Sequence, residues 1–174
     1  MKLLHFLAAA HSDEYLLSNN NRLKGHELGK SLHSAGLQQV SFVENAETDT
    51  EAYLWADFSE KKIVVAFRGT EIGKLGDVLT DLSVFQTPFL EQCSEFAGAQ
   101  VHQGFLKAFR SVQDAILQQL QFIFKAGARK FGEFPSERKW AIYITGHSLG
   151  GALALLLSAD LVSAFVPVMS ALYS

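Results

Sequence analysis

The residues best suited to chemistry in this sequence are a serine and the two glycines that flank it. Ser148 lies at the centre of residues 146–150 (GHSLG), which fit the pattern G-x-S-x-G. In this pattern the serine occupies a sharp turn from a strand into a helix, and the small residues let the two elements approach closely. The turn would expose the hydroxyl for nucleophilic attack, beside N–H groups at a helix start that favour developing negative charge.

The segments on either side of this turn have the character that the pattern requires. Residues 140–145 (WAIYIT) form an apolar, β-branched run that predicts a buried strand, and residues 149–165 predict a helix. The bare pattern arises easily by chance, because glycine and serine are common residues. A strand before the turn and a helix after it favour a nucleophile over the alternative, a glycine-rich turn with an idle serine.

A serine hydroxyl is a weak nucleophile at its ordinary pKa and needs a neighbouring base. The six histidines all precede Ser148: His5, His11, His26, His33, His102 and His147. The only acid after Ser148 is Asp160, about three turns into the predicted helix, where it should point away from the serine. His147 is adjacent to the serine, but the turn would direct its side chain elsewhere, so we expect a packing or orienting role. The sequence therefore supplies a nucleophile without an evident base.

The remaining chain predicts strands and helices that could support such a turn. Strand-like runs occupy residues 39–43, 52–58 and 62–67, and the last (KIVVAF) is apolar enough to be buried on both faces. Residues 59–61 predict a hairpin turn. Residues 104–126 predict a helix, because one apolar stripe recurs every three or four positions. Strands separated by long helices predict an α/β fold with a mostly parallel sheet flanked by helices.

Less regular segments lie between and before these elements. Ser12 followed by two acids predicts the start of a helix that continues to about residue 35, with Gly36 as its C-cap. Residues 70–93 predict a loop with a short helix around residues 78–85, and residues 127–138 predict a surface loop.

Composition and charge exclude several classes of function. The chain has 174 residues, enough for one domain, and its net charge of −3 does not suggest a nucleic-acid partner. The single cysteine, Cys93, cannot form an intrachain disulfide and is best interpreted as a buried or idle thiol. No pair of histidines has metal-ligand spacing, so we predict no metal and no other cofactor. No apolar run reaches the ~18 residues of a transmembrane segment.

The N-terminal residues leave the cellular compartment open. Residues 1–12 (MKLLHFLAAAHS) carry a lysine, a short apolar run and small residues, as secretory signals do, but His5 interrupts the run. The alternative is the first amphipathic helix of the domain. A single cysteine favours the cytoplasm, and secretion remains the alternative.

Three blocks of the sequence resemble one protein family, in the same order. They are residues 63–70 (IVVAFRGT), residues 101–109 (VHQGFLKAF) and residues 144–154 (ITGHSLGGALA). The chain resembles the class 3 lipases, the fungal-type triacylglycerol lipases of the α/β-hydrolase fold. The resemblance implies that Ser148 is the nucleophile. It also implies that Thr70 and the backbone N–H of Leu149 form the oxyanion hole.

The resemblance also assigns less central residues. Residues 71–85 match the place where these lipases carry a lid helix, which moves aside at an oil–water interface. His102 and Gly104 match a block whose role in the family is structural. Asp81 lies in the lid region, where we expect a solvated or capping role.

The chain departs from the family after the predicted elbow helix. The family carries its catalytic acid on the next strand and its histidine further on, and this sequence offers no position for either. We therefore expect residues 1–174 to be a single lipase-like domain with an incomplete α/β-hydrolase fold, lacking the C-terminal part that holds the acid and the histidine.

Two functions follow from this resemblance. The first is a serine hydrolase of lipid metabolism that cleaves carboxylic esters, above all acylglycerols, through a Ser148 acyl-enzyme. Its partners would be a lipid ester substrate and, transiently, a lipid interface. The alternative is a catalytically inactive lipase-like fragment or interaction module, which the missing acid and histidine would favour.

Overall fold

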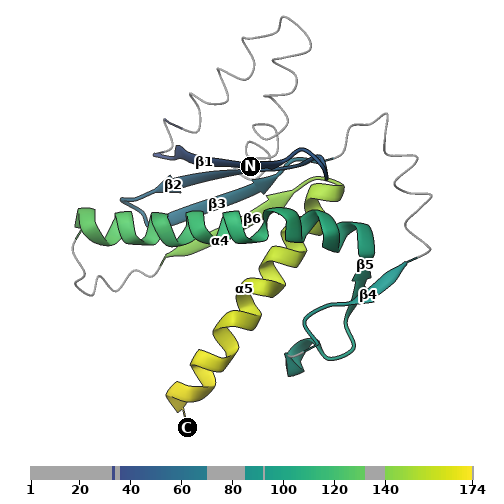
Figure 1. The fold of residues 1–174 in the computed structure, drawn as a ribbon. Coiled ribbons are helices and arrows are strands. Elements are labelled where there is room, and N and C mark those ends of the chain that lie inside the picture. Colours follow the sequence, from purple (N-terminus) through teal and green to yellow (C-terminus); the bar gives the residue numbers. More distant parts are fainter. Residues whose placement is uncertain (1–32, 34–35, 70–84, 92, 132–139, 174) are drawn as a thin grey trace, which may run out of the picture.

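The computed structural model describes residue 33 and residues 36–69, 85–91, 93–131 and 140–173. In this part of the chain, a four-stranded sheet packs against two long helices, and a two-stranded sheet lies to one side (Figure 1). Within the described residues, no helix is both long enough and apolar enough to cross a membrane.

The main sheet has the strand order β1-β2-β3-β6. Its strands are β1 (Gln38–Asn45), β2 (Thr50–Asp57), β3 (Lys62–Phe67) and β6 (Ala141–Gly146). The first three strands are antiparallel neighbours, and β6 lies parallel to β3 with Phe67 opposite Gly146. This register places the end of β3 beside the end of β6, where the predicted elbow begins.

The expectation of a mostly parallel sheet is wrong for the described strands, because two of the three pairings are antiparallel. The short turns at residues 46–49 and 58–61 can join only antiparallel neighbours, whereas a parallel pair needs a long crossover. The hairpin predicted at residues 59–61 is confirmed, and the parallel pair β3–β6 is the one that a helix separates in the sequence.

A buried carboxylate closes the turn between β2 and β3. Oδ1 of Asp57 accepts hydrogen bonds from the hydroxyl and the backbone N–H of Ser59 and from the N–H of Glu60, at 2.6 to 2.9 Å. Burial raises the pKa of Asp57, but these hydrogen bonds outweigh it, so the pKa lies below its ordinary value. The carboxylate therefore stabilises the turn in its ionised form.

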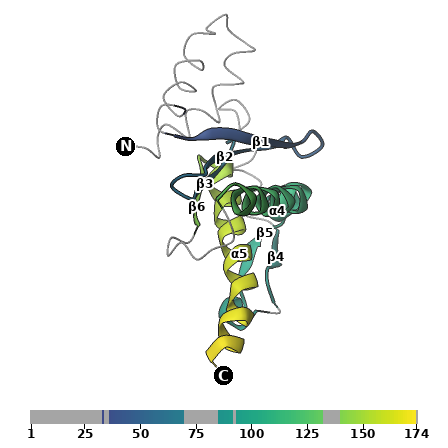
Figure 2. The ribbon, with the colours of Figure 1, turned by 90° about the vertical axis from the view of Figure 1, so that its left-hand side faces the viewer.

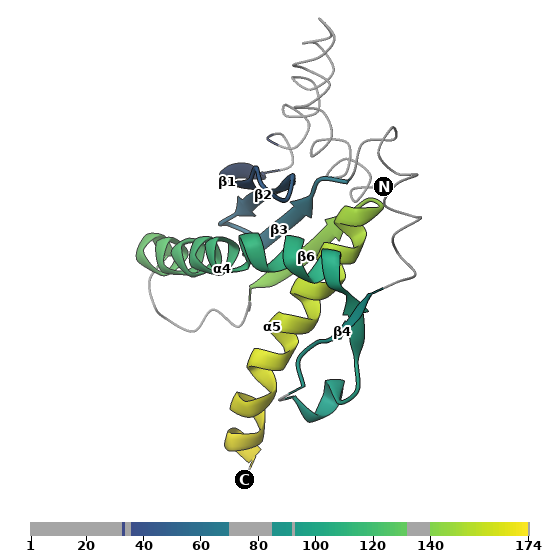
Figure 3. The ribbon, with the colours of Figure 1, turned by 45° about the vertical axis from the view of Figure 1, so that its right-hand side comes forward.

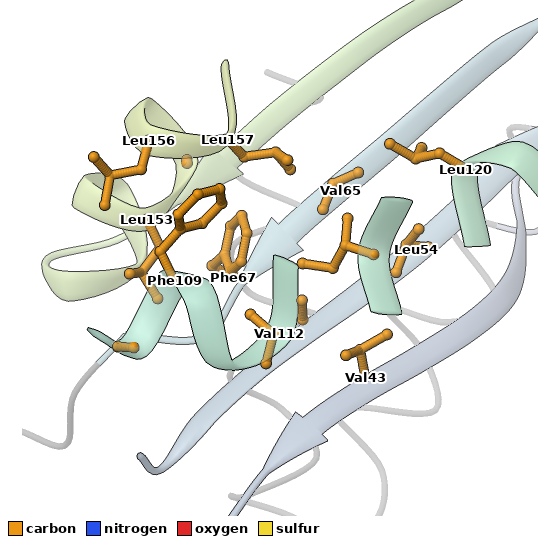
Figure 4. Packing of buried hydrophobic residues seen from close by; sticks show 14 of the residues in the cluster. Val43, Leu54, Val65, Phe67, Phe109, Val112, Leu120, Leu153, Leu156 and Leu157 are labelled. Atoms are coloured by element: carbon orange, nitrogen blue, oxygen red, sulfur yellow. The ribbon is translucent and has the colours of Figure 1, made fainter. Parts of the chain in front are cut away.

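Two helices cover one face of the sheet and form the main core with it. They are α4 (Gln103–Phe131), which runs across the strands, and α5 (Leu149–Tyr173), which begins at the end of β6 (Figure 1). In Figure 4, Phe109 and Val112 of α4 lie against strand side chains such as Leu54, while Leu153 of α5 lies nearby. Alternate residues of β2 and β3, among them Tyr53 and Val64, form a second buried cluster.

The helix α4 confirms the predicted apolar stripe but extends further than the prediction. We expected a loop from residue 127, whereas the helix continues to Phe131. Gly127 does not end it, because this glycine makes room for an aromatic ring: a Cβ there would lie 2.5 Å from Cζ2 of Trp140. Trp140 also packs edge-to-face on Phe58 and Phe124.

The helix α5 also extends beyond the prediction, which ended near residue 165. It continues to Tyr173, and its C-terminal part extends away from the sheet, as Figures 2 and 3 show from two directions. Its first half contributes Leu153, Leu156 and Leu157 to the core, whereas Leu155 is 71% exposed.

Two further expectations are corrected by the structure. Part of the predicted loop at residues 70–93 is a strand, β4 (Gln86–Pro88), which pairs with β5 (Gln100–His102). A 3₁₀ helix, Ser94–Phe96, lies between them. The strand β6 is not fully buried: Tyr143 is 48% exposed, because β6 lies at an edge of the described sheet.

Several sequence predictions lie outside the described residues. They are the N-terminal signal or helix from Ser12 to residue 35, the lid region with Asp81, and the loop at residues 132–138. Gly36 itself is described, and it has the left-handed φ of 82° expected of a glycine that ends a helix.

Candidate active site

The turn between β6 and α5 has the strained geometry that the G-x-S-x-G pattern predicts. The strand ends at Gly146 and the helix begins at Leu149, so His147 and Ser148 alone make the turn. Ser148 has a φ of 54°, a left-handed conformation that costs a non-glycine residue about 1–2 kcal/mol. Such strain persists where the surrounding structure enforces it, and it clusters at functional sites.

Backbone hydrogen bonds begin the helix directly after the serine. The N–H of Gly150 donates to the carbonyl of His147, and the N–H of Gly151 donates to the carbonyl of Ser148, each at 2.9 Å. Ser148 is exposed, and Leu149 follows it as the first residue of α5. The N–H of Leu149 therefore belongs to the first turn of the helix, where no intrahelical acceptor exists.

The glycines of the motif are required by close backbone contacts. A Cβ on Gly146 would collide with the backbone of Gly150, across the turn. A Cβ on Gly150 would lie 2.6 Å from the carbonyl oxygen of Phe67 and 2.8 Å from that of Arg68. The start of α5 is thus pressed against the end of β3, and no larger residue fits at either glycine.

The two predicted oxyanion-hole residues differ in what the structure describes. Leu149 lies next to Ser148 at the start of α5, as expected. Thr70 lies outside the described residues, and the chain is described up to Gly69, which is buried. The segment that leads to Thr70 therefore reaches the elbow at Phe67 and Arg68.

An ion-pair network at the end of β3, centred on the buried Arg68, was not predicted from the sequence. The guanidinium of Arg68 is only 5% exposed, and it pairs with Asp49 at 2.5 Å and with Glu51 at 3.3 Å. The N–H of Arg68 also donates to the carbonyl of Glu51 at 3.0 Å. An arginine that directly follows a buried strand was the available signal, because such a side chain is seldom buried unless paired.

The other titratable residues that the sequence singled out have contacts away from the serine. Asp160 accepts a hydrogen bond from Nε2 of Gln113, on α4, at 2.9 Å. The ring of His102 packs on Phe105 with the centroids 4.9 Å apart, which agrees with a structural role. His147 is exposed at the elbow.

Metal binding finds no support in the described residues. No group of three His, Cys, Asp or Glu side chains among them could hold a cation. Cys93 is half-buried and forms no disulfide among the described residues. The prediction that the protein uses no metal or cofactor stays a prediction.

The elbow and its flanking blocks lie within a recognised family. The family model described as lipase (class 3) matches residues 64–170, which include the end of β3, all of α4, β6 and most of α5. The chain belongs to the class 3 lipase family. The resemblance that the three sequence blocks indicated is therefore confirmed.

Individual lipases agree with this assignment. A lipase of Rhizomucor miehei is 29% identical over 133 residues, which are 75% of this chain and 32% of the relative. Among solved structures, lipase II of Rhizopus niveus matches with a TM-score of 0.68 and 24% identity, over 93% of this chain and 54% of that one.

The triacylglyceride lipase of Rhizomucor miehei gives a similar result, with a TM-score of 0.62 and 22% identity. The match covers 92% of this chain and 54% of the lipase. The predicted α/β-hydrolase fold is thus confirmed. The chain spans about half the length of these solved lipases and a third of the curated Rhizomucor relative.

Proposed function

We propose that the protein is a serine hydrolase that cleaves carboxylic esters of lipids, with acylglycerols as its substrate class. The observation that carries this proposal is the left-handed backbone of Ser148, held between the end of β6 and the start of α5 in a chain of the class 3 lipase family. Membership of that family, which includes a triacylglyceride lipase among the fold neighbours, supports the lipid ester substrate.

The proposed reaction uses Ser148 as the nucleophile. Its Oγ attacks the ester carbonyl carbon and forms a bond to it, while the hydroxyl proton passes to a base. The carbonyl oxygen becomes an oxyanion, which the N–H of Leu149 and the residue Thr70 stabilise. The C–O bond to the alcohol then breaks, the alcohol takes the proton, and water hydrolyses the acyl-enzyme to release the fatty acid.

The start of α5 supports the role of the Leu149 amide. A developing negative charge beside the first turn of a helix meets N–H groups that have no intrahelical acceptor. Removal of one oxyanion donor typically lowers kcat by a factor of about 10² to 10³. Since the donor at residue 149 is a backbone group, the position of the helix, and not the leucine side chain, determines its effect.

None of the described residues can be assigned as the base that takes the proton from Ser148. His147 is adjacent to Ser148 in sequence, and Asp160 is bound to Gln113 on α4. We propose a histidine as the base and a carboxylate that orients it, without assigning either role to a residue of this sequence. The substrate would be reached by transient contact with a lipid surface.

Ester hydrolysis by the whole chain tests the proposal. Because this sequence holds no evident base, we expect slow turnover of p-nitrophenyl butyrate and of emulsified tributyrin, which Ser148→Ala reduces to the rate of the buffer. Ser158→Ala is the matched control, because Ser158 lies on the same helix and its hydroxyl donates to the carbonyl of Ala154. Activity that persists in Ser148→Ala would remove Ser148 from the proposed role.

An inactive interaction module remains the second hypothesis from the sequence. None of the family matches or contacts described above favours it specifically. Absence of hydrolysis in the unaltered chain, with a folded α4 and sheet, would be the result that supports this alternative.

A further inference from the structure

We propose that Arg68 is a positioning residue, which holds the end of β3 against the nucleophile elbow through its ion pair with Asp49. The catalytic part of this inference rests on the proposed function. The structural part does not, because it concerns how firmly the start of α5 is held.

The guanidinium of Arg68 forms ion pairs with two carboxylates, those of Asp49 and Glu51. Nη2 lies 2.5 Å from Oδ1 of Asp49 and Nε lies 3.3 Å from Oε2 of Glu51, with the guanidinium buried. Nη2 also lies 3.5 Å from the carbonyl oxygen of Asp49. The hydrogen bonds of the guanidinium go from Nη2 to Asp49, while Nε lies within ion-pair distance of Glu51 without hydrogen-bond geometry. A planar guanidinium holds its donors in a rigid fork, which fixes its position better than a lysine ammonium would.

The second step is the rigidity of the turn that carries Asp49. Oδ1 of Asn45 accepts hydrogen bonds from the backbone N–H groups of Glu47 and Thr48, each at 3.1 Å. The hydroxyl of Thr48 lies 2.7 Å from that of Ser111, which joins the turn to α4. Asp49 itself has a left-handed φ of 49°. The carboxylate is therefore presented to Arg68 from a turn that is fastened to the core.

The third step is the contact between the end of β3 and the elbow. The carbonyl oxygens of Phe67 and Arg68 lie so close to Gly150 that even a Cβ does not fit between them. A shift of the backbone at Arg68 must therefore displace the start of α5 or open a gap beside it. If the start of α5 is displaced, the reacting atoms of Ser148 and Leu149 move with it, and if a gap opens, the turn that holds them loses its support.

In the proposed reaction, such a displacement would weaken the stabilisation of the transition state. Donors that stabilise an oxyanion must be held within about 0.5 Å of the productive position, because their effect depends on preorganisation. Loosening the pair Asp49–Arg68 should therefore lower kcat and leave KM unchanged. A lower fraction of folded protein would also lower the apparent kcat at unchanged KM, so kcat must be expressed per folded protein before the two effects are separated.

Asp49→Asn is the variant that tests the inference most cleanly. The Asp49 side chain is 56% exposed, so the substitution removes a charge without burying a new polar group. Glu47→Gln is the matched control, because it removes one charge from the same turn and Glu47 is exposed. Arg68→Lys is a second variant, which keeps the positive charge and loses the forked donor geometry.

Backbone hydrogen exchange, followed by NMR on the whole chain, is the deciding measurement. We expect Asp49→Asn and Arg68→Lys to accelerate exchange of the Arg68 and Gly151 amides by about tenfold more than exchange of a core amide such as Ile116. Glu47→Gln should leave the exchange rates of the Arg68 and Gly151 amides unchanged. Equal acceleration at all three amides, or none, would overturn the inference, because the ion pair would then act only on global stability or not at all.

Kinetics separate this inference from the proposed function. In ester hydrolysis, Asp49→Asn should lower kcat about tenfold at unchanged KM, while a rise in KM at unchanged kcat would contradict the catalytic part. If the unaltered chain shows no hydrolysis, the proposed function fails, and the exchange measurement still decides whether Arg68 positions the elbow.

Discussion

Backbone strain at Ser148 and the lack of space at the motif glycines define the elbow. The serine adopts a left-handed conformation. The two glycines allow the end of β6, the start of α5 and the end of β3 to pack in close backbone contact. The sequence pattern predicted this strained turn correctly, because the contact that excludes a side chain at Gly146 is local, although the contact at Gly150 involves the distant end of β3.

Gly150→Ala tests the packing of the elbow at this scale. The new Cβ would overlap the carbonyl oxygens of Phe67 and Arg68, which are backbone atoms and cannot move independently. We expect a loss of about 2 kcal/mol or more in the free energy of unfolding, measured with urea. Gly151→Ala is the comparison, since its Cβ would make a tight contact of 3.3 Å with the Gly146 carbonyl oxygen, which is longer than the 2.6 Å at Gly150, and we expect a smaller loss. Equal stability of the two variants would contradict the packing described here.

The sequence could indicate that Arg68 is paired, but not which residues it pairs with. Its partners, Asp49 and Glu51, lie far from it along the chain and come into contact only through the antiparallel pairing of β2 with β3. A pairing of this kind depends on strand register, which the pattern of residue types at Arg68 alone does not specify. The sequence therefore predicted the nucleophile and overlooked the residue that supports its surroundings.

Among the elements, α4 and β3 were the most predictable. An apolar stripe every three or four residues predicted α4, and a continuous apolar run predicted β3 with its observed bounds. The end of α4 and the short pair β4–β5 were not predictable in the same way. Gly127 lies inside the helix and leaves room for the distant Trp140, and three-residue strands are too short to show a period.

Phe109→Ala tests the contribution of α4 to the core. Phe109 is fully buried and packs edge-to-face on Phe89 with the ring centroids 6.3 Å apart. We expect a loss of about 3–5 kcal/mol in the free energy of unfolding, because a large cavity remains.

Phe122→Ala, on the same helix, provides the control for that experiment. Its side chain is 64% exposed, so a change within about 0.5 kcal/mol is expected. Comparable losses in the two variants, measured by urea unfolding, would show that α4 does not pack as described.

The turn between β2 and β3 predicts a pH dependence of stability. Because the pKa of Asp57 is lower in the folded chain than in the unfolded one, its contribution is present above an unfolded pKa of about 3.9. That contribution is lost as the pH falls through the lower, folded pKa. Asp57→Asn should therefore be less stable than the unaltered chain at pH 7, by about 1–3 kcal/mol.

The difference in the free energy of unfolding between Asp57→Asn and the unaltered chain should shrink as the pH falls below about 4. Urea unfolding at pH 7 and at pH 3 measures it, with the exposed Glu44→Gln as a control for a lost surface charge. A difference that stays constant between the two pH values would contradict the role of the ionised Asp57.

At the level of the whole molecule, the described chain contains part of a lipase-like arrangement. It has the β3 end, the elbow and α5, while it spans about half the length of the solved lipases that share its fold. The sequence predicted the family correctly from three separated blocks, and the family match over residues 64–170 confirms it. That residues 1–174 form a single domain stays a prediction.

The central claim is that the elbow presents Ser148 as a nucleophile. The most direct measurement is covalent labelling of the whole chain with a long-chain alkyl fluorophosphonate, followed by peptide mass spectrometry. We expect a single phosphonyl adduct on Ser148, which Ser148→Ala abolishes and Ser158→Ala retains. A folded chain that takes no label, or takes it on another serine, would contradict the claim.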